Sequence, residues 1–235
     1  MPTKQLKTYL VTGASSGIGL DIVRLLTARG HRIIATGRRG KADLPADFPD
    51  LEYLPADLGS EADRARIIDR LPGVLNRAIL AAGVGHYRPL SKENASDIRR
   101  TVNINLTANV CLAHALHAPL AKAGGRLGFV GSTAYRGAST MPIYAASKAA
   151  IDGFARSLAI EWSGKIVVKA LHPGPTATGM SVRAGRPADL LDRLMLPSPR
   201  VASALIAALE KDGGFRRIVS YASVWKRAIL AGNAA

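Results

Sequence analysis

The order of apolar and polar residues along the chain predicts strands that alternate with helices. Seven short apolar runs are typical of buried strands, and they cover residues 7–11, 31–36, 51–58, 77–80, 126–130, 165–171 and 215–221. Other segments carry apolar residues three or four positions apart, as amphipathic helices do, at residues 18–29, 59–70, 91–123, 144–162 and 201–209. This alternation indicates an α/β fold built on a parallel sheet.

The length of the chain favours one domain. A chain of 235 residues fits a single α/β core, and no internal repeat or low-complexity segment divides it. We therefore expect one domain over residues 1–235. Residues 179–199 are poorly patterned apart from a few apolar anchors, and we expect them to form a small lid of short helices after the sixth strand.

Composition narrows the possible functions. The net charge is +15 and the pI is about 10.5, but the basic residues are dispersed and aromatic residues make up only 5%, which argues against a nucleic-acid surface. A phosphorylated cofactor or an anionic substrate would account for part of the charge. One cysteine, Cys111, and five scattered histidines indicate no metal site. Because no apolar stretch is long enough to span a bilayer and no secretory signal precedes the first strand, we expect a cytoplasmic protein.

A glycine-rich turn connects the first predicted strand to the first predicted helix. It reads Thr12-Gly13-Ala14-Ser15-Ser16-Gly17-Ile18-Gly19. A turn of this kind lets the backbone approach a pyrophosphate and directs the N-terminus of the helix at its negative charge. We therefore expect the phosphates of a dinucleotide to contact Gly13, Ser15, Ser16, Gly17, Ile18 and Gly19.

The second predicted strand ends in Gly37-Arg38-Arg39. In dinucleotide-binding folds an acidic residue at this point takes the ribose 2′-hydroxyl of NAD, whereas an arginine accommodates the 2′-phosphate of NADP. Arg38 and Arg39 therefore indicate NADP(H).

Three further positions suggest contacts near a ligand. Two roles are open for Asp57, which follows the third strand: it can cap the next helix or accept a bond from an adenine amino group. The small residues 81–85 after the fourth strand would let a flat ring or a ribose lie close to the backbone. Asn105 stands within an apolar helical run, and taken alone it indicates a core asparagine with satisfied hydrogen bonds.

Tyr144 and Lys148 are four residues apart in a run that favours a helix, so they share one face. An ammonium beside a phenol would lower the phenol pKa and let the tyrosine exchange a proton near neutral pH. On spacing alone, an exposed pair without function is the alternative. Ser132 follows the fifth strand, at the sheet edge where ligand-facing groups gather, and the turn at 172–178 would present main-chain groups and hydroxyls to a ligand.

Taken together, these motifs resemble the short-chain dehydrogenase/reductase family in its single-domain, NADP-preferring form. The resemblance covers about residues 6–178 and rests on the glycine turn, Arg38, Asp57, Asn105, Ser132, Tyr144-x-x-x-Lys148 and Pro173-Gly174, in this order. It implies a doubly wound parallel sheet of the Rossmann type. It also implies an NADPH-dependent enzyme that interconverts a ketone or aldehyde and an alcohol by hydride transfer, working as a homodimer or homotetramer.

The resemblance also implies roles for individual residues. Tyr144 would be the general acid/base, Lys148 would lower its pKa and bind the nicotinamide ribose, and Ser132 would donate a hydrogen bond to the carbonyl oxygen. Asn105 would hold a water that links Lys148 to solvent. Besides the glycine turn and the two arginines, the cofactor site would include Asp57, Leu58, Ala82, Gly83, Tyr144, Lys148, Pro173, Gly174, Thr176 and Thr178.

Two departures from the family pattern leave alternatives open. The family's Asn-Asn-Ala-Gly stretch is Leu80-Ala81-Ala82-Gly83 here. The interval from Ser132 to Tyr144 is about one residue shorter than in many members, so Thr133 is an alternative anchor for the carbonyl.

The alternative functions are a non-catalytic NADP-binding sensor or scaffold, an epimerase, and a reductase of carrier-bound acyl chains. We expect a small, largely apolar carbonyl or alcohol substrate, with candidate pocket residues His86, Tyr87, Tyr135, Met141, Ile143, Met180 and Met195.

Overall fold

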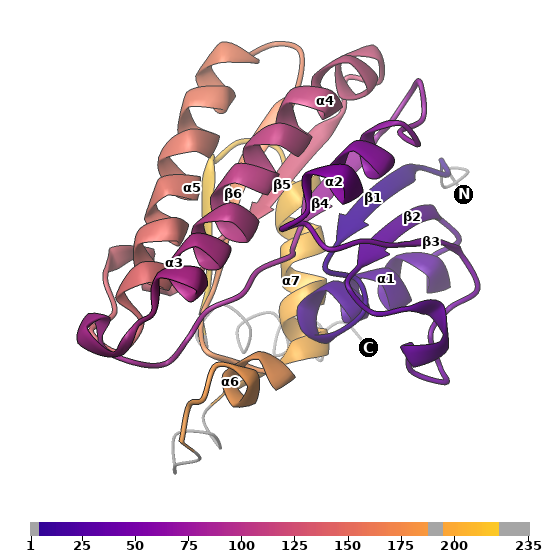
Figure 1. Cartoon of the computed structure of the whole chain (residues 1–235). Helices are drawn as coiled ribbons and strands as arrows, with labels where there is room; N and C mark the ends of the chain where they lie inside the picture. Colours follow the sequence, from indigo (N-terminus) through magenta and orange to yellow (C-terminus); the bar gives the residue numbers. More distant parts are fainter. Residues whose placement is uncertain (1–4, 188–194, 221–235) are drawn as a thin grey trace, which may run out of the picture.

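The computed structural model describes residues 5–187 and 195–220 of the chain, and a seven-stranded sheet lies at its centre (Figure 1). All pairings in this sheet are parallel, and the strand order is β3-β2-β1-β4-β5-β6-β9. The strands are β1 (Thr8–Thr12), β2 (Arg32–Gly37), β3 (Glu52–Pro55), β4 (Arg77–Leu80), β5 (Arg126–Val130), β6 (Val167–Pro173) and β9 (Arg216–Val219). The chain runs outward from β1 to β3 and then returns to the other side of β1 at β4. The predicted doubly wound parallel sheet is therefore confirmed.

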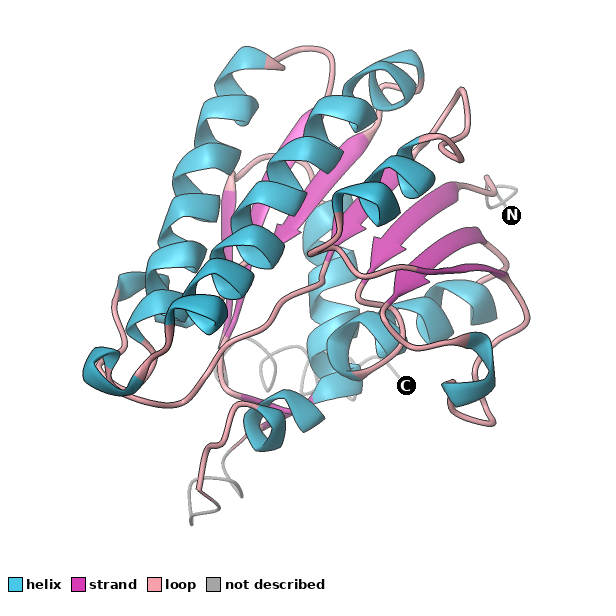
Figure 2. Cartoon of the chain, in the orientation of Figure 1, coloured by secondary structure: helices cyan, strands magenta, loops and turns pink. Residues whose placement is uncertain are grey.

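Helices cover both faces of the sheet (Figure 2). On one face, α1 (Gly17–Ala28) packs against α7 (Ser198–Glu210), and their apolar residues, such as Ile22 and Leu205, form one buried core with the sheet. On the other face lie α2 (Glu61–Ile68), α3 (Ala95–Val102), α4 (Ala108–Lys122) and α5 (Pro142–Glu161), which bury a second core around Leu112, Leu116 and Ile151. Because both faces are covered, the central strands β1, β4 and β5 carry mostly apolar residues rather than an alternation of apolar and polar ones.

The helix expected over residues 91–123 is divided in the structure. It begins with α3, passes through a π-helical segment, η3 (Asn103–Thr107), and continues as α4. The π-helical segment inserts an extra residue into the turn that contains the fully buried Asn105. Residues 90–92 form a separate short turn, η2 (Leu90–Lys92), ahead of α3.

Short elements surround the carboxyl ends of the strands. After β6 come β7 (Thr176–Ala177) and α6 (Gly179–Arg183), and β7 pairs with β8 (Leu196–Pro197). Two 3-10 turns, η1 (Lys41–Asp43) and η4 (Thr133–Arg136), follow β2 and β5. Of the lid predicted over 179–199, residues 188–194 lie outside the described residues, as does Tyr221 at the end of the predicted last strand. In the described part of the chain, no helix combines the length and apolar character needed to cross a membrane.

Candidate active site

The glycine turn between β1 and α1 forms one wall of a cavity at the carboxyl ends of the strands. Gly13 has a φ of +69°, and a Cβ there would lie 2.8 Å from the Cα atom of Ala82. A Cβ at Gly19 would lie 2.2 Å from the carbonyl oxygen of Gly13, so only glycine permits this close approach. Ser16 caps α1 through its backbone alone, and no acidic residue lies in the first turn. Within the described part of the chain, no side chain accepts from the first N–H groups of α1, and Gly17, Ile18 and Gly19 line the cavity, which suits an anion.

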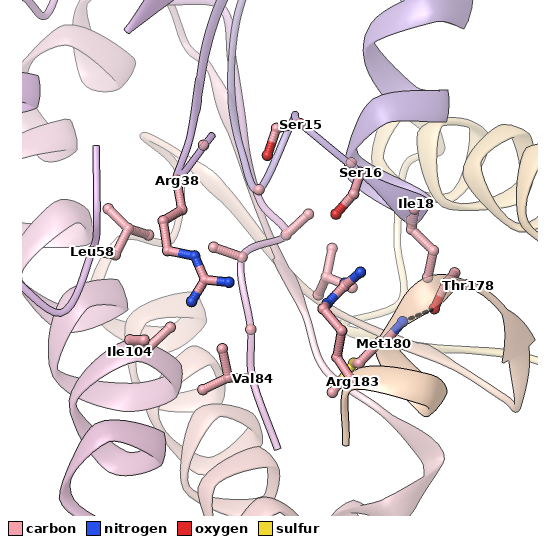
Figure 3. Close-up of a pocket in the computed structure, with 18 of the residues that line it drawn as sticks. Ser15, Ser16, Ile18, Arg38, Leu58, Val84, Ile104, Thr178, Met180 and Arg183 are labelled. Carbon is pink, nitrogen blue, oxygen red and sulfur yellow. Dashed lines mark hydrogen bonds between the residues drawn. The ribbon is translucent and has the colours of Figure 1, made fainter. Parts of the chain in front are cut away.

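Two arginines enter the cavity from opposite sides, Arg38 from the end of β2 and Arg183 from α6 (Figure 3). Arg39, beside Arg38, donates to the carbonyl oxygen of Ser15 at 3.1 Å. Burial together with the nearby positive charges of Arg39 and Arg38 lowers the pKa of Arg183. Of the described residues that line the cavity, Asp57 alone is acidic. This end of the cavity is therefore an electropositive site of the kind that phosphate groups would occupy.

Arg183 was not among the residues predicted from the sequence. Its only sequence signal is its position five residues after Thr178, in a segment whose fold the pattern does not predict. The short helix α6 brings it to the cavity because the Thr178 hydroxyl accepts a bond from the N–H of Met180 and starts the helix there.

Asp57 lies beside Leu58 in the cavity wall but does not cap the following helix. Its carboxylate accepts hydrogen bonds from Arg100 at 2.8 Å and from the N–H of Gly59 at 2.9 Å. Burial by itself would raise the pKa of Asp57, but these hydrogen bonds outweigh it and the pKa is lowered. Ser60 is the residue that caps α2, by accepting from the N–H of Asp63. Of the two roles left open for Asp57, the helix-capping one is wrong.

Hydrogen bonds fix the loop after β4 even though the family's asparagine is missing there. The N–H of Ala82 donates to the Thr12 hydroxyl at 3.1 Å, and the side chain of Asn105 accepts from the N–H of Val84 and donates to its carbonyl oxygen. Ala82, Gly83 and Val84 line the cavity, whereas Asn105 lies behind them. Gly83 lies between the side chains of Lys148 and Asn105. A Cβ on Gly83 would lie 3.3 Å from the Nζ atom of Lys148 and 3.5 Å from the Oδ1 atom of Asn105.

Tyr144 and Lys148 both lie on α5 and both line the cavity. Lys148 is only 4% exposed, its Nζ atom donates to the carbonyl oxygen of Val130 at 2.9 Å, and it lies 5.6 Å from the centre of the Tyr144 ring. Burial lowers the pKa of Lys148 to about 8. Burial raises the pKa of the Tyr144 phenol, and its hydrogen bond with Ser132 acts in the opposite direction. The expected lowering of the Tyr144 pKa by Lys148 is absent here, because the ammonium lies over the ring and is bonded to the main chain.

Some of the remaining predicted residues line the cavity and others do not. Ser132 is not among the lining residues, although Val130 and Gly131 just before it are. The Ser132 hydroxyl accepts from the N–H of Ala134 at the start of η4. Pro173 and Thr178 line the cavity, but Gly174 and Thr176 are not among its lining residues. The Thr176 hydroxyl donates within its own turn, to the carbonyl oxygen of Gly174.

The residues predicted to contact the substrate do not all line the cavity. Met180 lines the cavity, and Met141 is close enough to touch a Cβ placed on Gly85. Tyr135 instead lies against His172, with ring centres 4.3 Å apart, and is not among the residues that line the cavity.

His86 lies near Glu93 and Asp97, and the three could offer ligand atoms to a metal ion. Arg88 already forms ion pairs with both carboxylates, so we assign no metal to this cluster.

Known proteins similar to this chain agree with the cavity geometry in indicating a dinucleotide-binding fold. A family model described as short chain dehydrogenase matches residues 7–188. The chain belongs to the short-chain dehydrogenase family. A solved short-chain dehydrogenase from Sphingobium yanoikuyae, in complex with NADPH, superposes with a TM-score of 0.83 at 28% identity, covering 97% of this chain and 94% of that one.

Curated relatives of this short-chain dehydrogenase carry different functional names. The cyclic-di-GMP-binding biofilm dispersal mediator protein of Escherichia coli (strain K12) is 33% identical over 202 residues, which are 80% of this chain and 81% of the relative. Carbonyl reductase family member 4 of Danio rerio is 26% identical over 235 residues, with 89% and 98% covered. The family model indicates an oxidoreductase family, but the names of these two relatives do not agree on one function.

Proposed function

We propose that this short-chain dehydrogenase is an NADP(H)-dependent oxidoreductase that reduces a ketone or aldehyde to an alcohol. The observation that carries the proposal is the meeting of four features in one cavity: the glycine turn, the guanidinium of Arg38, and the side chains of Tyr144 and Lys148. The NADPH complex of the Sphingobium yanoikuyae relative supports the choice of cofactor.

The residues of the cavity fit that cofactor. The free N–H groups of α1 and the side chain of Arg183 would hold the pyrophosphate, and Arg38 with Arg39 would hold the 2′-phosphate. Asp57 and Leu58 would border the adenine, and Lys148 the nicotinamide ribose. When bound, the cofactor supplies a hydride, which is one proton with two electrons, to the carbonyl carbon of the substrate.

The protein supplies the proton that balances the reaction. Because burial raises the pKa of Tyr144, its phenol is protonated at neutral pH and can donate to the substrate oxygen as the carbonyl bond is reduced. The Ser132 hydroxyl would donate a hydrogen bond to the same oxygen. Lys148, which is charged at neutral pH, would keep its bond to the carbonyl oxygen of Val130 and reach the nicotinamide ribose. Asn105 would then position the loop at Val84 rather than act on the substrate itself.

Loss of the phenol tests this function. We expect the purified protein to oxidise NADPH with members of a panel of apolar ketones and aldehydes, and Tyr144→Phe to lower kcat by about a hundredfold or more while NADPH still binds. NADPH consumption is followed by absorbance, and NADPH binding by its fluorescence. No NADPH consumption with any carbonyl, together with identical behaviour of the variant, would contradict the proposal. Conversion of a substrate without net NADPH consumption would indicate an epimerase.

A second candidate function is nucleotide sensing in the same cavity. The Escherichia coli relative is named for binding cyclic-di-GMP. The guanidinium groups of Arg38 and Arg183 line the cavity without a hydrogen-bonded partner among the described residues, and they would suit two phosphates. Titration calorimetry with cyclic-di-GMP, in the presence and absence of NADPH, distinguishes the two functions. Tight binding that NADPH prevents, without carbonyl reduction, would support a sensor; absence of binding would exclude it.

Three predictions about the whole protein also belong to this proposal. We expect residues 1–235 to form one domain, the active form to be a homodimer or homotetramer, and the protein to work in the cytoplasm. Light scattering at several concentrations measures the oligomeric state, and limited proteolysis checks for a second folding unit.

A further inference from the structure

A line of polar side chains, buried at His172 and Asp152, runs behind Ser132, and the proposed reaction does not use it. It begins at His172 near the end of β6, which is 0% exposed. The Nε2 atom of His172 lies 2.9 Å from a carboxylate oxygen of Asp152, one turn after Lys148 on α5. Arg216 on β9 completes the line, because its guanidinium forms a two-point ion pair with the same carboxylate. His172 of β6, Asp152 of α5 and Arg216 of β9 are thus joined in one line, and the imidazole lies against Ser132, which follows β5.

The chemistry of Asp152 determines where the proton of His172 lies. Burial by itself would raise the pKa of Asp152, but its bonds to Arg216 and His172 lower it, so the carboxylate is ionised and can only accept. The hydrogen of neutral His172 is therefore on Nε2, and Nδ1 is an acceptor. Nδ1 lies 3.2 Å from the main-chain nitrogen of Ser132. In this tautomer it accepts the N–H of Ser132.

Packing holds this imidazole against the Ser132 segment. A Cβ at Gly131, the residue before Ser132, would lie 2.4 Å from the Nδ1 atom of His172, so only glycine allows the ring to come this close. Tyr135, three residues after Ser132, stacks on the same ring, and the guanidinium of Arg216 lies 5.2 Å from the centre of the Tyr135 ring. His172 thus contacts the segment 131–135 at three places: at Gly131, at the N–H of Ser132 and at the ring of Tyr135.

We propose that His172, oriented by Asp152 and Arg216, is a positioning residue that sets the direction of Ser132 toward the substrate oxygen. The inference rests on the proposed function, in which Ser132 is the carbonyl anchor. An anchor displaced by about 1 Å can lower a rate by about a hundredfold, so a group that fixes the Ser132 main chain would act on kcat more than on cofactor binding.

Protonation of His172 reverses its bond to Ser132. The Nδ1 atom is also 3.0 Å from the carbonyl oxygen of Ser132, and a protonated imidazole would donate there instead of accepting from the N–H. The charged and titratable groups that face His172 are Asp152 from α5, Arg216 from β9 and Tyr135 from η4. Burial outweighs the bonds from Asp152 and Ser132 and lowers the pKa of His172 below its ordinary 6.5, so the imidazole is neutral at neutral pH.

Two replacements of His172 separate positioning from folding. His172→Phe fills the space but leaves the N–H of Ser132 without an acceptor, whereas the side-chain oxygen of His172→Asn can take the place of Nδ1. We expect His172→Phe to lower kcat about tenfold to a hundredfold with little change in the KM for NADPH, and His172→Asn to recover most of that loss. Equal kcat values for wild type and His172→Phe, in folded protein and at all pH values, would overturn the proposal.

The dependence of kcat on pH, and two arginine variants on β9, provide further tests. Wild-type kcat should fall on the acid side of the ordinary imidazole pKa as His172 gains a proton, and this acid limb should be absent from His172→Asn. Arg216→Met should lower kcat, while Arg217→Met, an exposed neighbour on the same strand, should behave as wild type. An acid limb that persists unchanged in His172→Asn would count against the proposal.

Nuclear magnetic resonance of the wild-type protein tests the geometry without turnover. With ¹⁵N-labelled histidine, His172 should show the Nε2–H tautomer at neutral pH, and the amide resonance of Ser132 should shift with the midpoint of the His172 titration. An Nδ1–H tautomer, or a Ser132 amide that does not follow His172, would overturn the inference. Failure to reduce any carbonyl would instead overturn the proposed function, so the two failures are distinguishable.

Discussion

Arg38 and Arg183 should affect cofactor binding in different ways, although both point into the same cavity. Arg38 follows β2 beside Gly37, where a 2′-phosphate would lie. Arg183 is the last residue of α6, and its guanidinium reaches back to Gly179 at the start of that helix, across the cavity from Arg38. Replacing Arg38 by methionine should weaken NADPH binding and leave NADH binding unchanged. Replacing Arg183 by methionine should weaken both equally, because the two cofactors share the pyrophosphate.

The size of each effect follows from the contacts that are lost. A hydrogen bond to a charged group contributes about 1.5–3 kcal/mol, which is roughly a tenfold to hundredfold change in Kd. The lower part of that range applies to Arg38, because Arg39 remains next to it and is held by the carbonyl oxygen of Ser15. We therefore expect the Kd for NADPH to rise about tenfold in Arg38→Met, and somewhat more in Arg183→Met.

Fluorescence titration with NADPH and NADH measures these constants. Arg70→Met is the matched control, because it removes one positive charge from an exposed position at the end of α2, outside the residues that line the cavity. Equal losses of NADPH and NADH affinity in Arg38→Met would refute the assignment of Arg38 to the 2′-phosphate. A loss in Arg70→Met as large as in Arg38→Met would show that net charge, rather than contact, determines affinity.

Three further predictions concern other parts of the chain. Gly19→Ala places a Cβ 2.2 Å from the carbonyl oxygen of Gly13, so the turn must shift; NADPH binding by fluorescence should be largely lost and the thermal midpoint lowered, and an unchanged Kd would contradict the fit of the turn. Lys148 has a pKa of about 8, so its charge disappears as pH rises through 8; kcat/KM for reduction should fall above that pH, and Lys148→Met should be slow at every pH and lack this limb. Hydrogen bonds from Arg77, Lys7 and Tyr9 outweigh burial and lower the pKa of Glu210 to about 2, so its stabilisation is complete above the ordinary value of 4.5 and disappears as pH falls toward 2. Glu210→Gln should therefore reduce the free energy of unfolding at pH 7 by about 2 kcal/mol, with a smaller difference at pH 3, as measured by urea denaturation.

The sequence predicts the fold well because its strongest signals are local. Apolar runs, the glycine turn and the helix that carries Tyr144 each depend on residues close together in the chain, and the structure confirms the sheet that they predict. Arg38 could be identified from local sequence as well, because the apolar residues of β2 show where that strand ends and Arg38 follows directly.

The parts that could not be predicted depend on contacts between distant segments. His172 touches Asp152, 20 residues away, and Asp152 pairs with Arg216, 64 residues away, and no spacing in the sequence indicates either contact. The expected effect of Lys148 on Tyr144 depended on side-chain direction, and helical spacing gives only the shared face: the ammonium turns to the carbonyl oxygen of Val130. Arg183 was missed because the short helix that presents it starts from one side-chain cap, at Thr178.

The π-helical turn at Asn103–Thr107 has a consequence for engineering this protein. A regular α-helix advances about 100° per residue, so removing the extra residue would rotate the chain before it and take the amide of Asn105 out of register with the loop at Val84. A redesign that optimises helical regularity would therefore produce a smoother helix and a displaced cavity wall. The irregular backbone here is the part of the helix that thermostabilising substitutions should leave alone.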